Sequence, residues 1–118
     1  MSDAVFVYGL LKPGFRLHHE VAGYVLRAEP ATVRGRLYDV GVPAVRFDET
    51  GEVDGYVLHL DPSRTAEALN RLDAVEDEGK LYTRVLVGAD TPGGRVVAWA
   101  YEYAGAARPH AFVGREWR

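Results

Sequence analysis

Residues 5–14 read "VFVYGLLKPG" and decide how the fold begins. Four residues suited to a buried strand, Val5 to Tyr8, run directly into a loop that is bracketed by Gly9 and Gly14. Because the apolar run is too short for a helix and ends at a glycine, it predicts a buried strand over residues 4–8.

The loop after this strand has two interpretations. Gly9 and Gly14 have the spacing of a phosphate-binding loop, but Phe15 and Arg16 occupy the positions where such a loop needs Lys and Ser or Thr. We therefore expect no nucleotide site. A glycine at a strand end can still let successive backbone N–H groups point into one concavity, which binds an anion or a carbonyl oxygen. On the sequence alone, a plain turn and such a binding loop both stay open.

Further strand patterns follow along the chain. They cover residues 31–41, 42–47, 52–61, 81–89 and 94–105. The turn formers "DETG" (48–51) and "DTPGG" (90–94) each separate two of these patterns, so we expect a hairpin at both places.

Asp61 and Pro62 begin the one well-defined helix. The Asp61 carboxylate suits the N-cap because it accepts hydrogen bonds from free N–H groups, and Pro62 suits the first helical position because it has no N–H. The apolar spacing predicts a buried face made of Ala66, Leu69, Leu72 and Val75. A second, weaker helical pattern covers residues 17–26, where Gly23 interrupts it.

Five or six mostly antiparallel strands with one good helix and one poor helix predict a single α+β domain, closed or half-closed as a barrel. The 118 residues fit one domain, with a core over about 4–104 and a C-terminal tail over 105–118 that we expect to be irregular. With no cysteine, any chemistry must use oxygen or nitrogen groups.

Charge and targeting features exclude several classes of partner. The net charge is −3 with scattered basic residues, so neither a nucleic acid nor an anionic membrane surface is expected to bind. The N-terminus has no basic segment, and its apolar run is about half of the roughly 18 residues that a membrane span requires. We therefore expect a cytoplasmic protein.

The end of the predicted helix gathers carboxylates within "RLDAVEDEGKLYTR" (71–84), namely Asp73, Glu76, Asp77 and Glu78. A helix C-terminus and like-charged neighbours both disfavour a carboxylate, so we expect a raised pKa here. A glutamate works best as general acid and base when its pKa moves from about 4.3 toward about 6 to 7. A solvated acidic helix end is the alternative.

Two other kinds of chemistry find no support. His18, His19 and Glu20 are adjacent, so on a helix they face different directions and do not converge on one metal ion. Ser2 and Ser63 are the only serines, and neither lies in a nucleophile-elbow pattern, which excludes serine hydrolase chemistry.

Four motifs in order resemble the γ-glutamylcyclotransferase-like family over roughly residues 4–104. They are "VYGLLKPG" (7–14), "GRLYDVGVP" (35–43), "VDGYV" (53–57) and "LDAVE" (72–76) followed by "YTR" (82–84). The family's fold is a small mixed barrel with helices. Its members release a γ-glutamyl group as 5-oxoproline from a dipeptide, glutathione or an isopeptide amine, and they use no cofactor.

The resemblance assigns roles to particular residues. It implies that Glu76 is the catalytic acid and base, and that Tyr8, Gly9, Leu10 and Leu11 form the loop that binds a small γ-glutamyl substrate. Tyr82 is implied near the same site. No metal ligand is implied. Leu10 departs from the family, which usually has Ser or Thr there.

Two rival functions stay open. The domain can be a binding or regulatory module that keeps the pocket without turning a ligand over. It can also be a related amide-bond enzyme, a hydrolase or acyl transferase that acts on another amine. The identity of the leaving amine and the oligomeric state are not readable from the sequence.

Overall fold

The computed structural model describes residues 2–106, 108 and 111–118. Its strands are β1 (Ala4–Val7), β2 (Val25–Arg34), β3 (Arg36–Asp39), β4 (Pro43–Arg46), β5 (Glu52–Leu60), β6 (Tyr82–Thr91), β7 (Gly94–Tyr103) and β8 (Phe112–Gly114). The helical elements are α1 (Thr65–Val75) and three 3-10 turns, η1 (His18–Glu20), η2 (Ala22–Tyr24) and η3 (Pro62–Arg64). Within the described ranges, no helix combines the length and the apolar character needed to cross a membrane.

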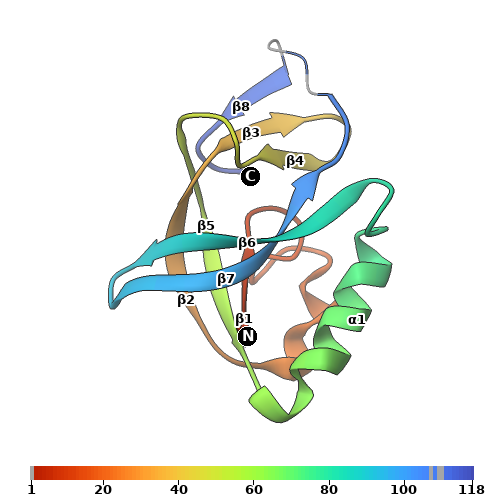
Figure 1. Ribbon diagram of the computed structural model, residues 1–118, viewed down its shortest axis with the longest axis vertical. Helices are drawn as coiled ribbons and strands as arrows, with labels where there is room; N and C mark the ends of the chain where they lie inside the picture. Colours follow the sequence, from red (N-terminus) through yellow and green to blue (C-terminus); the bar gives the residue numbers. More distant parts are fainter. Residues whose placement is uncertain (1, 107, 109–110) are drawn as a thin grey trace.

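Five strands form a closed barrel in the order β1-β5-β2-β6-β7. All neighbours pair antiparallel except β1 and β7, whose parallel contact between Val5 and Trp99 closes the barrel. The predicted α+β barrel is confirmed, as is the hairpin at residues 90–94, which joins β6 and β7. Figure 1 shows α1 alongside this barrel and a small sheet beyond one of its ends.

That small sheet has the order β4-β3-β8. The chain leaves the barrel at Gly35, where an added Cβ would lie 3.0 Å from the carbonyl oxygen of Arg46, so this close crossing favours glycine. The single strand expected over 31–41 is therefore divided between two sheets. The hairpin expected at 48–51 is wrong, because β5 pairs with β1 and β2 on its two edges and leaves β4 to pair with β3.

The C-terminal tail is more ordered than expected. Its residues 112–114 form β8, which pairs with β3, so the expectation of an irregular tail is wrong there. The sheet supplies the reason, since β3 has an edge that β4 does not use. Residues 107 and 109–110 of the tail lie outside the described residues.

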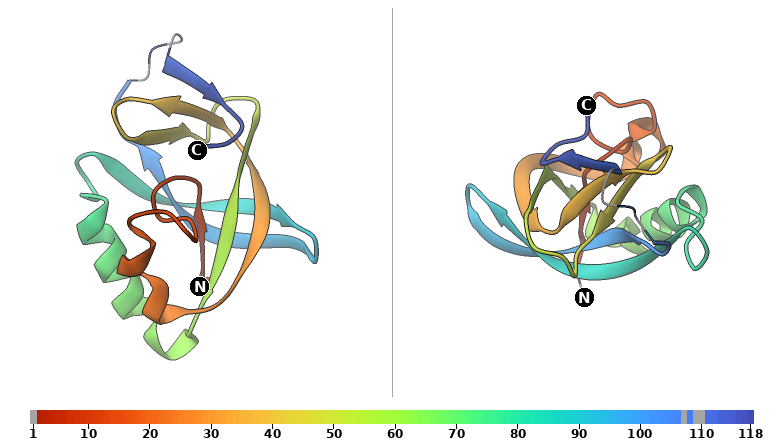
Figure 2. Two further views of the ribbon diagram at one scale, coloured as in Figure 1. Left: turned by 180° about the vertical axis from the view of Figure 1, so that it is seen from behind. Right: turned by 90° about the horizontal axis from the view of Figure 1, so that it is seen from above.

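The predicted helix over residues 17–26 is also wrong. The segment forms η1 and η2, and from Val25 on it pairs with β5, so strand pairing prevails over a weak helical pattern. Figure 2 shows these two turns beside α1, which agrees with the packing of η1 against α1.

The N-terminal cap of the well-defined helix is as predicted. Asp61 accepts a hydrogen bond from the Ser63 N–H at 3.0 Å, and Pro62 opens the turn that leads into α1. Leu69 and Leu72 are buried as expected. The other two predicted positions differ, because Ala66 is exposed and Val75 is only half-buried, while Thr65 and Ala68 are buried instead.

Strand β1 is buried on both faces, which explains its continuous apolar run. Phe6 points into the barrel interior with Val33, Val53 and Val57. The alternate residues of β1 pack against α1, in a second cluster that holds Val5, Val7, Leu58, Leu69 and Leu72. The loop that follows β1 is therefore held between the barrel and the helix.

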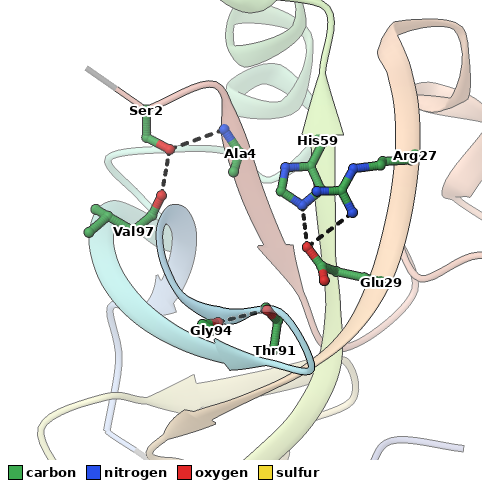
Figure 3. Close-up of polar contacts among 8 residues, drawn as sticks. All are labelled: Ser2, Ala4, Arg27, Glu29, His59, Thr91, Gly94 and Val97. Carbon is green, nitrogen blue, oxygen red and sulfur yellow. Dashed lines mark hydrogen bonds and ion pairs between the residues drawn. The ribbon is translucent and has the colours of Figure 1, made fainter.

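Polar contacts tie neighbouring strands together on the outside of the barrel (Figure 3). The Glu29 carboxylate of β2 accepts from His59 Nε2 of β5 at 2.5 Å and from Arg27 at 3.3 Å. At the N-terminus, the Ser2 hydroxyl donates to the Val97 carbonyl oxygen at 2.6 Å. These contacts fasten strand edges and lie apart from the pocket described below.

Candidate active site

A pocket of about 150 Å³ lies between the loop after β1, the C-terminal end of α1 and the start of β6. All six residues assigned to the site from the sequence line it: Tyr8, Gly9, Leu10, Leu11, Glu76 and Tyr82. The fold brings them together because β1 and α1 pack in one core cluster, which places the end of the strand near the end of the helix.

The backbone of the loop is held from one side. The carbonyl oxygens of Gly9 and Leu10 accept from the N–H groups of Lys12 (3.1 Å) and Leu17 (3.0 Å). The Leu11 carbonyl oxygen lies 2.8 Å from His18 Nδ1, which carries the proton because a carbonyl oxygen can only accept.

The N–H groups of the same loop are free. In the part of the chain that the structure describes, no acceptor bonds the backbone N–H of Gly9, Leu10 or Leu11. Adjacent free N–H groups on a pocket wall form a site for an anion or a carbonyl oxygen. Gly9 itself leaves room for the Pro43 ring, which an added Cβ would approach to 2.6 Å.

Glu76 is the residue that follows α1, and its backbone N–H caps the helix by donating to the Leu72 carbonyl oxygen at 2.9 Å. Its side chain is partly buried, and burial raises the pKa of the carboxyl from 4.5 to about 7. No described group hydrogen-bonds to that carboxyl, which is therefore free to exchange protons with a ligand in the pocket.

The cause of this raised pKa differs from the one expected from the sequence. Burial of the carboxyl is its cause, and the neighbouring carboxylates are not among the causes. Asp77 and Glu78 are exposed, and Asp73 is held by Tyr101 and Arg84. Of the four carboxylates at the end of the helix, Glu76 is the one that lines the pocket.

Two tyrosine hydroxyls anchor the walls of the pocket. Tyr82 donates to the Pro43 carbonyl oxygen at 2.5 Å, and Tyr8 donates to the Tyr101 carbonyl oxygen at 2.6 Å. Burial raises the pKa of both phenols, so each stays protonated near neutral pH. The Tyr8 oxygen also accepts from the backbone N–H of Val45, whereas the Tyr82 oxygen keeps a lone pair with which it can accept a hydrogen bond from a ligand.

Among the pocket residues that sequence reasoning did not assign, two carry polar side chains, Tyr101 and Arg16. Tyr101 lines the pocket from β7, and its hydroxyl donates to Asp73 at 2.6 Å, which in turn is 3.0 Å from Arg84 Nε. Only the pairing of β7 beside β1 brings it there. Arg16 lines the pocket as well, although in the sequence it served only as an argument against a phosphate loop.

Comparison with known proteins agrees with the architecture. The family model described as "Gamma-glutamyl cyclotransferase, AIG2-like" matches residues 5–118, so the match includes the tail. No curated protein matches the sequence.

Several solved structures share the fold, among them the following three. YkqA from Bacillus subtilis is 27% identical with a TM-score of 0.74; the match covers 99% of this chain but 40% of YkqA, so the chain spans less than half of that protein. An AIG2-like protein from Mus musculus (23% identity, TM-score 0.72) is matched over 92% of this chain and 81% of its own. PH0828 from Pyrococcus horikoshii (24% identity, TM-score 0.70) is matched over 95% and 86%.

Proposed function

The chain belongs to the gamma-glutamyl cyclotransferase, AIG2-like family, and from that premise we propose that it cyclises a γ-glutamyl amide to 5-oxoproline and releases an amine. The observation that carries the proposal is the carboxyl of Glu76, whose pKa is raised to about 7 in the same pocket as the free N–H groups of the loop. A proton acceptor and a group of carbonyl donors are the two parts that this reaction requires.

In the proposed complex, the γ-glutamyl unit lies between the loop and Glu76. The N–H groups of Gly9, Leu10 and Leu11 donate to the γ-carbonyl oxygen and stabilise the negative charge that develops on it. Tyr82 is proposed to accept a hydrogen bond from the substrate through its free lone pair. The small pocket holds the substrate bent, with its α-amine near its own γ-carbonyl carbon.

The ring closure needs one proton acceptor that later becomes a donor. The Glu76 carboxylate takes a proton from the α-ammonium, and the freed amine attacks the γ-carbonyl carbon to form the new C–N bond. The old amide C–N bond then breaks as Glu76 returns the proton to the leaving nitrogen. The ring nitrogen gives up its second proton to the regenerated Glu76 carboxylate, which passes it to the released amine, so that the products are neutral-ring 5-oxoproline and an ammonium group. Proximity supplies much of the rate, since effective molarities of intramolecular reactions reach about 10⁵ M or more.

The pKa of Glu76 suits both halves of this cycle. A group with a pKa of about 7 is available as carboxylate and as acid near neutral pH. Leu10 does not interfere, because in this proposal the loop acts through its backbone N–H groups and the side-chain hydroxyl found in most of the family is not needed.

The experiment is to incubate the protein with γ-glutamyl amino acids and γ-glutamyl amines and to detect 5-oxoproline by mass spectrometry. Glu76→Gln preserves the shape of the side chain and removes its titration, so the rate should fall by about 10²-fold or more. Glu78→Gln is the matched control, because Glu78 is exposed and lies outside the pocket lining.

Undiminished product from Glu76→Gln would contradict the mechanism. Binding of 5-oxoproline without turnover of any γ-glutamyl amide would point instead to a non-catalytic binding domain.

A further inference from the structure

The pocket has a buried base and an exposed mouth. Gly9, Leu11 and Tyr82 are buried at the base, where the free N–H groups and the carboxyl of Glu76 lie. At the mouth, Arg16 is exposed and Leu81 is 39% exposed. A substrate whose reacting bond lies at the base therefore extends its outer part toward these residues.

Arg16 is the one cation on the described pocket wall, and Glu76 is the one anion. No described residue forms an ion pair with Arg16. Its backbone is nevertheless fixed, because its carbonyl oxygen lies 2.9 Å from His19 Nδ1. An arginine side chain at a pocket mouth that has no ion-pair partner among the described residues can pair with an anionic group of the ligand.

The position of this cation separates it from the reacting centre. In the proposed reaction Glu76 contacts the α-ammonium, and the α-carboxylate of the γ-glutamyl unit is only two bonds away. Glu76 is partly buried near the base of the pocket, whereas Arg16 is exposed at its mouth. Arg16 therefore faces the outer part of the substrate, which in this reaction is the leaving amine.

We infer that Arg16 determines specificity by pairing with a carboxylate on the leaving amine, so that the preferred substrate is a γ-glutamyl amino acid or peptide with a free carboxylate. This inference rests on the proposed function. The half-buried Leu10 and Leu17 and the exposed Leu81 surround the same opening, so they contact the carbon skeleton of the leaving group. An amine without a negative charge would leave Arg16 unpaired.

The test compares two ligands that differ in the charge of the leaving group, γ-glutamyl-leucine and γ-glutamyl-leucinamide. The same comparison is then made with γ-glutamyl-leucylglycine and its C-terminal amide. For the wild-type protein, kcat/KM should favour the free carboxylate by about fivefold, the size expected of a partly exposed ion pair. Arg16→Gln should abolish the preference, Arg16→Lys should keep part of it, and Arg16→Glu should reverse it. Arg34→Gln removes the same charge at an exposed position outside the pocket lining and should keep the preference.

Two results would overturn the inference. An unchanged preference in Arg16→Gln would show that Arg16 does not recognise the carboxylate. Equal weakening of both ligands would place Arg16 on the γ-glutamyl unit that they share.

Calorimetric titration of the same ligands into Glu76→Gln separates this inference from the proposed reaction. A carboxylate preference in binding that depends on Arg16, without turnover by the wild-type protein, would support the inference and contradict the reaction. Turnover by the wild-type protein without an Arg16-dependent preference would support the reaction and contradict the inference. If the ligands neither bind nor turn over, both the inference and the reaction are overturned.

Discussion

Replacing Glu76 by glutamine should make the folded protein more stable at high pH and leave its stability at low pH nearly unchanged. Burial raises the pKa of the Glu76 carboxyl from 4.5 to about 7, so the folded state keeps its proton in a range where the unfolded chain has lost it. The free energy of unfolding therefore falls as the pH rises from about 4.5 to about 7. At about 1.36 kcal/mol for each pH unit, the wild-type protein loses about 3 kcal/mol across this range.

Glutamine does not titrate, so the variant escapes this loss. Urea denaturation of both proteins between about pH 4 and about pH 8.5 gives the difference in unfolding free energy, in which the contributions of all other titrating groups cancel. The difference should grow by about 3 kcal/mol in favour of Glu76→Gln as the pH rises. Glu78→Gln, with an exposed carboxylate, should show no such trend. A difference between wild type and Glu76→Gln that is constant across the pH range would refute the claim that burial governs this carboxyl.

Three further predictions concern the pocket. The value of kcat/KM should rise as the pH passes through about 7, because Glu76 accepts a proton only as carboxylate; a flat profile between about pH 6 and about pH 8 would contradict its role as base. Leu10→Ser should change kcat/KM by less than about threefold, since the backbone N–H remains; an increase of about tenfold or more would show that a hydroxyl is needed. Lys12 is only 2% exposed and donates from Nζ to the Trp117 carbonyl oxygen at 2.5 Å. Lys12→Met should therefore speed hydrogen exchange at the N–H of Lys12, which bonds to the Gly9 carbonyl oxygen, and at the N–H of Asp54, which bonds to the Arg115 carbonyl oxygen. Unchanged exchange at both amides would show that this contact does not hold the loop to the tail.

The sequence predicted correctly those elements whose stabilising contacts are local. The strand at residues 4–8 is recognisable because both of its faces are buried, and the cap at Asp61 because its hydrogen bond is made within three residues. The hairpin at 90–94 joins strands that have each other as neighbours. In these cases the residues near in sequence are also the ones that interact.

The wrong secondary-structure predictions concern segments whose strand partners are distant in the sequence. The turn at 48–51 joins no hairpin because β1 and β2 occupy both edges of β5, and β8 exists because β3 offers an edge to the tail. The 17–26 segment became two turns and a strand for the same reason. None of these partners is visible from local spacing.

Several residues of the pocket lining were predictable from the sequence, but the cause of the raised Glu76 pKa was not. The motif resemblance named Glu76 and the loop, and the pocket contains them. The sequence suggested that crowded carboxylates raise the pKa of Glu76, whereas burial of its carboxyl does so. Arg16 and Tyr101 were missed because their place on the pocket wall depends on how β1, the following turns and β7 pack.

The most direct test of the central claim is to run the reaction with γ-glutamyl-leucine in water enriched in ¹⁸O and to identify the product by mass spectrometry. Intramolecular attack by the α-amine uses no water, so the wild-type protein should release unlabelled 5-oxoproline together with leucine, and Glu76→Gln should release almost none. Glutamate that carries ¹⁸O would show hydrolysis by water, and equal 5-oxoproline from both proteins would show that Glu76 takes no part; either result would contradict the account.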